Sequence, residues 1–146
     1  MLARAMMMAA SAVNNYAAVV LADKPVAYWP LNETSGTTAY DLSGNGNDAT
    51  YTTGFALGSP PIASGLSVCC NLTGTGSYIS GPASPVNIPV GNDSYTLEIW
   101  ANSTYAESQY AQYGAQLLGF GGYGTNNYVN ALKFMANSTN NGNGFT

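Results

Sequence analysis

Residues 27–52 read AYWPLNETSGTTAYDLSGNGNDATYT, and they carry the strongest structural signal in the chain. It opens with Tyr28, Trp29 and Leu31, whose aromatic and aliphatic side chains favour β-structure. Asp41 stands where its carboxylate can brace a turn, and SGNGND at 43–48 supplies residues that tolerate positive φ angles. A short apolar run at 49–52 follows. The stretch therefore predicts strands at 26–31 and 49–52 with a tightly bonded turn between them.

The rest of the chain repeats this pattern of short apolar runs separated by turn-forming residues. No helical periodicity extends over a dozen residues, so strands joined by turns are expected. Further strands are predicted at 66–72, 77–80, 95–101, 116–120 and 129–135. The turn clusters between strands include GSPP at 58–61, GPASP at 81–85 and GNDS at 91–94. Short strands at this regular spacing favour a sandwich or a barrel.

The stretch 95–101, YTLEIWA, is the clearest of the predicted strands. Successive side chains of a strand point to opposite faces, so its odd-numbered residues share one face. We expect that face to lie in the core, with the side chains of Tyr95, Leu97, Ile99 and Ala101.

The motifs resemble those of a known family. Residues 27–52, LTGTGSYIS at 72–80 and SYTLEIWAN at 94–102 are similar, in this order, to the laminin-G-like branch of the concanavalin A-like lectin and glucanase superfamily. The resemblance covers roughly residues 23–134. It implies an all-β fold, a two-sheet antiparallel jelly-roll sandwich, in an extracellular or cell-surface protein. Domains of this kind bind carbohydrate or protein, or form structural parts of surface proteins.

The predicted organisation has three parts: an apolar N-terminal arm at 1–22, the laminin-G-like jelly roll at 23–135, and a polar tail rich in Asn and Gly at 136–146. The arm is signal-like, because Arg4 precedes an apolar stretch that small residues follow. Its residues 16–21, YAAVVL, have an alternative interpretation as an apolar strand.

The resemblance also predicts open sheet edges. Nothing at 121–146 is similar to the strands that complete the sheets in the family, and soluble domains avoid unpaired edges. We therefore expect the arm of one copy to act as a donor strand for the next. Such a head-to-tail contact propagates into a filament unless it closes into a ring. The expected assembly residues are Tyr16, Val19, Val20 and Leu21.

The charge balance excludes several classes of function. Charged residues are 7% of the 146, with three Lys and Arg against seven Asp and Glu, and the net charge is -4. No cationic surface is then available to neutralise the phosphates of a nucleic acid. The absence of His removes Ser/His and Cys/His nucleophiles and ordinary zinc sites. A membrane span is not expected, because Asn14 and Asn15 interrupt the apolar arm.

Glycosidase chemistry requires two carboxyl groups beside the scissile bond, and the sequence does not supply the pair. Glu98 has Thr96 and Trp100 as neighbours on its face, and Asn102 stands where a second acid would serve. The paired acids of the glucanase branch are therefore missing here, and we expect no enzymatic activity.

Calcium is the one metal ion that the sequence makes plausible, because calcium prefers oxygen ligands. No other cofactor is expected. The candidate ligands lie within eight residues of one another: Asp41, Asn45, Asn47 and Asp48. Turn formation explains the same residues without an ion, and both interpretations stay open at this point.

Two further sets of residues are candidates for covalent chemistry. Five sequons predict N-glycosylation of a secreted protein, at Asn32, Asn71, Asn92, Asn102 and Asn137. Cys69 and Cys70 are adjacent, and an ordinary disulfide between consecutive residues of a strand is sterically unfavourable. The alternatives are two buried thiols, or one buried thiol and one available to another chain.

Two functions fit these observations. The first is a non-catalytic extracellular structural subunit that assembles with other copies of itself through the N-terminal arm, into a filament or surface polymer. The alternative is a carbohydrate-binding or adhesion module whose tyrosine rings stack on glycans. The expected ligand-binding residues of that module are Tyr105, Tyr110, Tyr113 and Tyr123.

Overall fold

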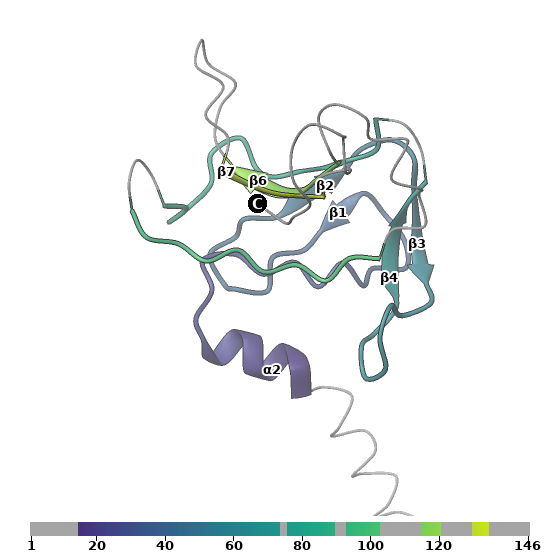
Figure 1. Cartoon of the computed structure of the whole chain (residues 1–146), viewed down its shortest axis with the longest axis horizontal. Helices are drawn as coiled ribbons and strands as arrows, with labels where there is room; N and C mark the ends of the chain where they lie inside the picture. The colour runs from purple at the N-terminus through teal and green to yellow at the C-terminus, as the bar shows by residue number, and fades with distance from the viewer. Residues whose placement is uncertain (1–14, 74–75, 90–92, 103–114, 121–129, 135–146) are drawn as a thin grey trace, which may run out of the picture. The chain divides into compact units, whose positions relative to one another are not determined.

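The computed structural model describes residues 15–73, 76–89, 93–102, 115–120 and 130–134. The chain divides into two compact units, Met1–Asp93 and Ser94–Thr146. The described residues form one short helix, α2 (Asn15–Ala22), and seven short strands, β1 to β7 (Figure 1). Every strand pair among them is antiparallel. The described part of the chain is therefore mainly β-structure, as the all-β prediction requires.

The first unit contains a three-stranded sheet in the order β1-β2-β5. Its strands are β1 (Thr38–Ala39), β2 (Ala49–Tyr51) and β5 (Ile79–Ser80). Thr50 in the central strand pairs with a residue of each neighbouring strand, Thr38 of β1 and Ser80 of β5. In β2 the side chains alternate between buried and exposed, so one face of this sheet lies inward.

A two-stranded ribbon, β3 (Phe55–Ser59) with β4 (Cys69–Leu72), completes the strands of the first unit. The two strands run side by side in Figure 1. Their register shifts between Ala56 and Ser59. Beyond the end of β4, the backbone N–H of Thr73 donates to the carbonyl of Gly54 at 2.7 Å.

The core of the first unit is small and lies against the inner face of the β1-β2-β5 sheet. Among the described residues its buried hydrophobic members are Ala39, Ala49 and Tyr51. The Tyr51 ring stacks on Phe55 with centroids 5.2 Å apart, which joins the sheet to the ribbon. Partly buried side chains pack around this centre: Trp29, Leu31, Phe55, Leu57, Cys70 and Ile79.

In the second unit, β6 (Ala115–Phe120) pairs with β7 (Asn130–Phe134). The strands predicted at 116–120 and 129–135 are confirmed to within one residue. Phe120 also contacts Tyr95 edge to face, with ring centroids 5.0 Å apart. That contact ties part of the 93–102 segment to β6.

Three of the predicted strands are wrong. Residues 16–21 belong to helix α2, because NYAAVVLA contains three alanines, the strongest helix former. The helix ends at Ala22; Lys24, two residues later, has a left-handed φ of +53°, and Pro25 follows. Among the described residues no helix has the length and apolar character needed to cross a membrane.

The other two wrong strands are those at 26–31 and 95–101, which form no strand in the described part of the chain. In the first, Pro30 has no backbone donor and Leu31 takes a φ of +54°. In the second, Leu97 and Ile99 are half-buried as expected, but Tyr95 and Ala101 are exposed. Alternation of apolar and polar residues predicts which side chains share a face, but a β-strand forms only where its backbone also has a neighbouring strand with which to hydrogen-bond.

Candidate functional site

The most highly connected group of side chains lies in residues 41–48, here called the Asp41 turn. Each of the two carboxylate oxygens of Asp41 accepts two hydrogen bonds. Oδ1 accepts from the backbone N–H groups of Tyr28 and Ser43, each at 2.9 Å. Oδ2 accepts from the Ser43 hydroxyl at 2.7 Å and from the Asn47 N–H at 2.9 Å. Partial burial acts to raise the pKa of Asp41, but these four donors outweigh it and hold the pKa below its ordinary value.

Asn47 is the buried centre of the turn, with 1% of its surface exposed. Its amide nitrogen donates to the carbonyls of Val26 at 2.9 Å and Val86 at 3.0 Å, and its Oδ1 accepts from the Val86 N–H at 2.7 Å. Its own carbonyl accepts from the Trp29 indole at 2.8 Å. One side chain therefore holds together three segments that are far apart in the sequence.

The local sequence explains why the turn closes. Gly44 and Gly46 take φ angles of +89° and +75°, which other residues reach only with strain. The turn predicted at 43–48 is confirmed. Asp48 then closes the loop, because its Oδ1 accepts from the backbone N–H of Asp41 at 2.8 Å.

The four residues expected to bind calcium are thus brought together in one turn, where their side chains are already engaged. The Asp41 and Asp48 carboxylates accept backbone N–H bonds, and the Asn45 and Asn47 Oδ1 atoms accept from Asn87 and Val86. A calcium ion takes six to eight oxygen ligands and would have to displace several of these bonds. No group of three or more His, Cys, Asp or Glu that could hold a metal occurs among the described residues. Calcium binding stays a prediction.

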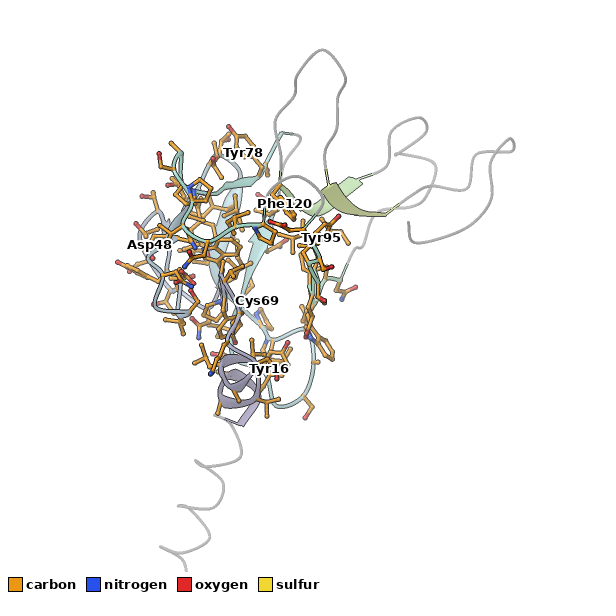
Figure 2. All side chains as sticks on the ribbon, turned by 90° about the vertical axis from the view of Figure 1, so that its left-hand side faces the viewer. Tyr16, Asp48, Cys69, Tyr78, Tyr95 and Phe120 are labelled. Carbon is orange, nitrogen blue, oxygen red and sulfur yellow. The ribbon has the colours of Figure 1, made fainter. Side chains whose placement is uncertain are left out.

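The outward face of the β1-β2-β5 sheet is a second candidate, here called the tyrosine face. Alternation along the strands places its central row at Thr38, Thr50 and Ser80. Tyr40 and Tyr78 flank that row and are 56% and 55% exposed. Asp48 and Thr52 complete the face. In Figure 2 the side chains of Asp48 and Tyr78 lie at the periphery of the molecule.

A polar contact also reaches the inner side of this sheet. The Tyr51 hydroxyl donates to Glu33 Oε2 at 2.6 Å, and Glu33 Oε1 accepts from the Tyr40 N–H at 2.9 Å. Burial, the hydrogen bond and the charge of Glu33 all raise the pKa of Tyr51 far above its ordinary value. Burial, followed by the proximity of Cys69 and Glu33, raises the pKa of Cys70 to about 11. Neither group is set up as a nucleophile at neutral pH.

The cysteines expected to be thiols are both free and half-buried. The Cys69 thiol donates to the carbonyl of Pro60 at 3.0 Å. In the second unit, Glu98 is exposed and accepts a hydrogen bond from the Trp100 indole at 3.2 Å.

The arm residues expected to mediate assembly lie on helix α2. Val19 and Leu21 are 56% and 37% exposed, while Tyr16 and Val20 are half-buried. The helix carries no charged residue in its first or last turn. An apolar surface without charge is therefore available on the arm.

Several other predicted site residues are distributed over the chain. Of the sequon asparagines, Asn32, Asn71 and Asn102 are exposed. Asn92 and Asn137 lie outside the described residues, as do the four tyrosines expected to bind glycans: Tyr105, Tyr110, Tyr113 and Tyr123. Neither Tyr40 nor Tyr78 was predicted as a site residue, because no strand was predicted at β1 and the strand predicted at 77–80 gives no sign that it pairs with β2.

Comparison of the chain with models of protein families, with curated proteins and with solved structures finds no significant match.

Proposed function

We propose that this chain is a non-catalytic, extracellular structural module with a laminin-G-like jelly roll, and that it assembles with other copies of itself through the N-terminal arm. The observation that carries the proposal is the exposed apolar surface of helix α2. Val19 and Leu21 present that surface, and no charge in the terminal turns opposes a close contact.

The class of fold is supported by the residues that carry the resemblance. The stretch 27–52 builds the Asp41 turn and the inward-facing strand β2, and the antiparallel order β1-β2-β5 is compatible with one sheet of a sandwich. The apolar inner face of such a sheet requires a second layer. A high-resolution structure of the assembled protein tests whether two sheets enclose Ala39, Ala49 and Tyr51 as a jelly roll.

The assembly mode follows from the form of the arm. Because residues 15–22 are helical, a contact through them packs side chains and does not extend a sheet. An isolated helix of eight residues is marginal in water, so packing of its apolar side on a partner stabilises it. A second copy is a suitable partner, since a chain with only 7% charged residues has little repulsion between its copies.

Sedimentation velocity over a range of protein concentrations tests this proposal. We expect the wild-type chain to form larger species as concentration rises. The double variant Val19→Gln and Leu21→Gln keeps a good helix former at both positions, so it should remain monomeric with an intact fold.

The matched control replaces Leu42 and Ile62, which are 47% and 37% exposed but lie outside the arm. Leu42→Gln with Ile62→Gln should assemble like the wild type. A wild-type chain that stays monomeric at every concentration, or an arm variant that assembles unchanged, would contradict the proposal.

Carbohydrate binding is a second candidate function, and the tyrosine face favours it. Two exposed rings flank a row of hydroxyl groups, a combination in which rings pack on the apolar faces of sugars and hydroxyls bond to sugar oxygens. Asp48 is the one charged residue of that face, and a neutral oligosaccharide therefore fits better than an anionic ligand.

Affinity electrophoresis in gels that contain neutral polysaccharides separates the two functions. Retardation that Tyr40→Ala and Tyr78→Ala abolish, and that Tyr40→Phe preserves, supports the glycan-binding module. Migration that no polysaccharide changes would leave the structural module as the sole candidate. The absence of reducing-sugar release in the same gels is expected under both functions.

A further inference from the structure

Asn45 is followed by Gly46 on the surface of the Asp41 turn, a pair whose chemistry neither proposed function uses. In a flexible Asn-Gly pair the glycine backbone nitrogen attacks the asparagine Cγ, because glycine has no Cβ to hinder the approach. A Cβ built on Gly46 would meet nothing within 4 Å, so the pair is open to solvent. The intrinsic reactivity of this position is therefore high.

The fold restrains the reacting amide at both ends. Asn45 Nδ2 donates to the Val26 carbonyl at 3.1 Å and to the Ser43 hydroxyl at 3.3 Å. Asn45 Oδ1 accepts from the Asn87 amide at 3.0 Å. Attack by the Gly46 nitrogen requires the side chain to leave these three partners and swing toward the backbone.

We propose that Asn45–Gly46 is a spontaneous deamidation site that the Asp41 turn protects while it is closed. When the turn opens, a bond forms between the Gly46 nitrogen and Asn45 Cγ while the bond from Cγ to Nδ2 breaks. Ammonia leaves with the hydrogen of the Gly46 N–H, and a succinimide remains. Water then opens the succinimide, which gives aspartate or isoaspartate at position 45.

Aspartate or isoaspartate at position 45 cannot restore the hydrogen bonds that close the turn. A carboxylate at position 45 has no donor for the Val26 carbonyl or the Ser43 oxygen. It also competes with Asp41 for the single Ser43 hydroxyl hydrogen, which Asp41 Oδ2 holds at 2.7 Å. The residue at position 45 would add a third carboxylate to the turn, which already holds Asp41 and Asp48, and like charges within one turn repel each other. Deamidation therefore records that the turn has been open.

Digestion with an enzyme that cuts before aspartate measures the reaction. It releases the unreacted and the isoaspartate forms of residues 41–47 as one peptide, and it cuts the aspartate form once more, into residues 41–44 and 45–47. Fragmentation of that peptide by mass spectrometry separates Asn45 from Asn47. Folded protein and protein in concentrated urea are incubated in mildly alkaline buffer and sampled over time. The pairs Asn141–Gly142 and Asn143–Gly144 give internal reference rates in urea.

We expect Asn45 to react like the reference pairs in urea and more slowly in the folded protein. Three hydrogen bonds of ordinary net strength correspond to a slowing of about tenfold to a thousandfold. Equal rates in the two conditions, or a faster reaction in the folded protein, would overturn the proposal.

A single substitution tests the role of the restraint itself. Asn87 is exposed and has a φ of +59°, so Asn87→Gly removes one hydrogen bond to Asn45 without backbone strain. Deamidation in the folded variant should accelerate several-fold, and Asn71→Ser, a change at an exposed asparagine outside the turn, should leave it unchanged. An Asn87→Gly rate equal to that of the wild type would show that these bonds do not set the rate, and would also refute the proposal.

Discussion

Replacing Asn47 by alanine tests the central structural claim, that one buried amide holds the first unit together. The side chain is 1% exposed and makes three hydrogen bonds, two from its nitrogen to Val26 and Val86 and one to its oxygen from Val86. No buried side-chain nitrogen or oxygen lacks a partner in the described part of the chain. The substitution removes all three bonds and puts nothing in their place.

The size of the effect follows from those bonds. Each contributes about 0.5 to 1.5 kcal/mol net, so the sum of the three is about 1.5 to 4.5 kcal/mol. The Val26 carbonyl keeps Asn45 Nδ2 as a donor, whereas Val86 loses the partner of both its N–H and its carbonyl. Small domains are stable by about 5 to 15 kcal/mol, so Asn47→Ala should remove a large fraction of the stability of this unit.

Urea unfolding followed by tryptophan fluorescence measures the loss. The chain has two tryptophans, and Trp29 donates its indole N–H to the Asn47 carbonyl. A Trp100→Phe background therefore leaves Trp29 as the single reporter, and its indole is bonded to the turn. Asn32→Ala, at an exposed residue of the same type, is the control and should change the free energy of unfolding by less than about 0.5 kcal/mol. A cost of Asn47→Ala as small as that of the control would refute the reasoning.

Three other measurements test individual groups. The lowered pKa of Asp41 contributes stability that is fully present above the ordinary aspartate pKa of about 3.9 and is lost as the pH falls through the lower folded-state value. In urea titrations at a series of acid pH values, Asp41→Asn should therefore make the free energy of unfolding less dependent on pH. The same pH dependence in the variant and the wild type would contradict this prediction. Tyr51→Phe removes the 2.6 Å bond to Glu33 and should cost about 1.5 to 3 kcal/mol in thermal unfolding, and an unchanged melting temperature would contradict this. Cys70, whose pKa is raised to about 11 by burial and by Cys69 and Glu33, should react with iodoacetamide at least about tenfold more slowly in the folded than in the unfolded protein, and mass spectrometry that finds equal rates would disprove the burial.

The sequence was a reliable guide where local chemistry alone determines the structure. The turn at 43–48 and strand β2 were predicted because glycines that tolerate positive φ precede an alternating strand. The strands at 116–120 and 129–135, which correspond to β6 and β7, were predicted because each is a short apolar run between turn-forming residues. The clustering of Asp41, Asn45, Asn47 and Asp48 was also anticipated, since eight consecutive residues closed by a turn must lie close together.

The sequence was a poor guide where distant partners decide. The backbone of Val86 makes two hydrogen bonds with the Asn47 side chain, 39 residues away, and no sequence pattern around Val86 predicts that contact. Residues 16–21 had an alternative interpretation as an apolar strand, but the alanines of this segment favour the helix α2 that forms. The tyrosine face could not be read, because its residues come from strands of two and three residues.

The small core and the polar turn have different roles in the first unit. Of the three buried hydrophobic residues in the described part of this unit, two are alanines, and such small apolar contacts tolerate more than one arrangement. Strands of two or three residues do not fix their own register either. A slip of β1 by one residue against β2 would bring Thr38 to the inner face in place of Ala39.

The bond from the Asp41 N–H to Asp48 lies just beyond the Ala39 and Ala49 pair, since Asp41 is two residues after Ala39 and Asp48 directly precedes Ala49. Any slip of the register breaks that bond, together with the bond that the Asn47 N–H donates to Asp41 Oδ2. The side chains of the Asp41 turn therefore select the register from which the inner face and the tyrosine face both follow. Damage to the turn, by mutation or by deamidation, should change which residues are buried as well as lower the stability.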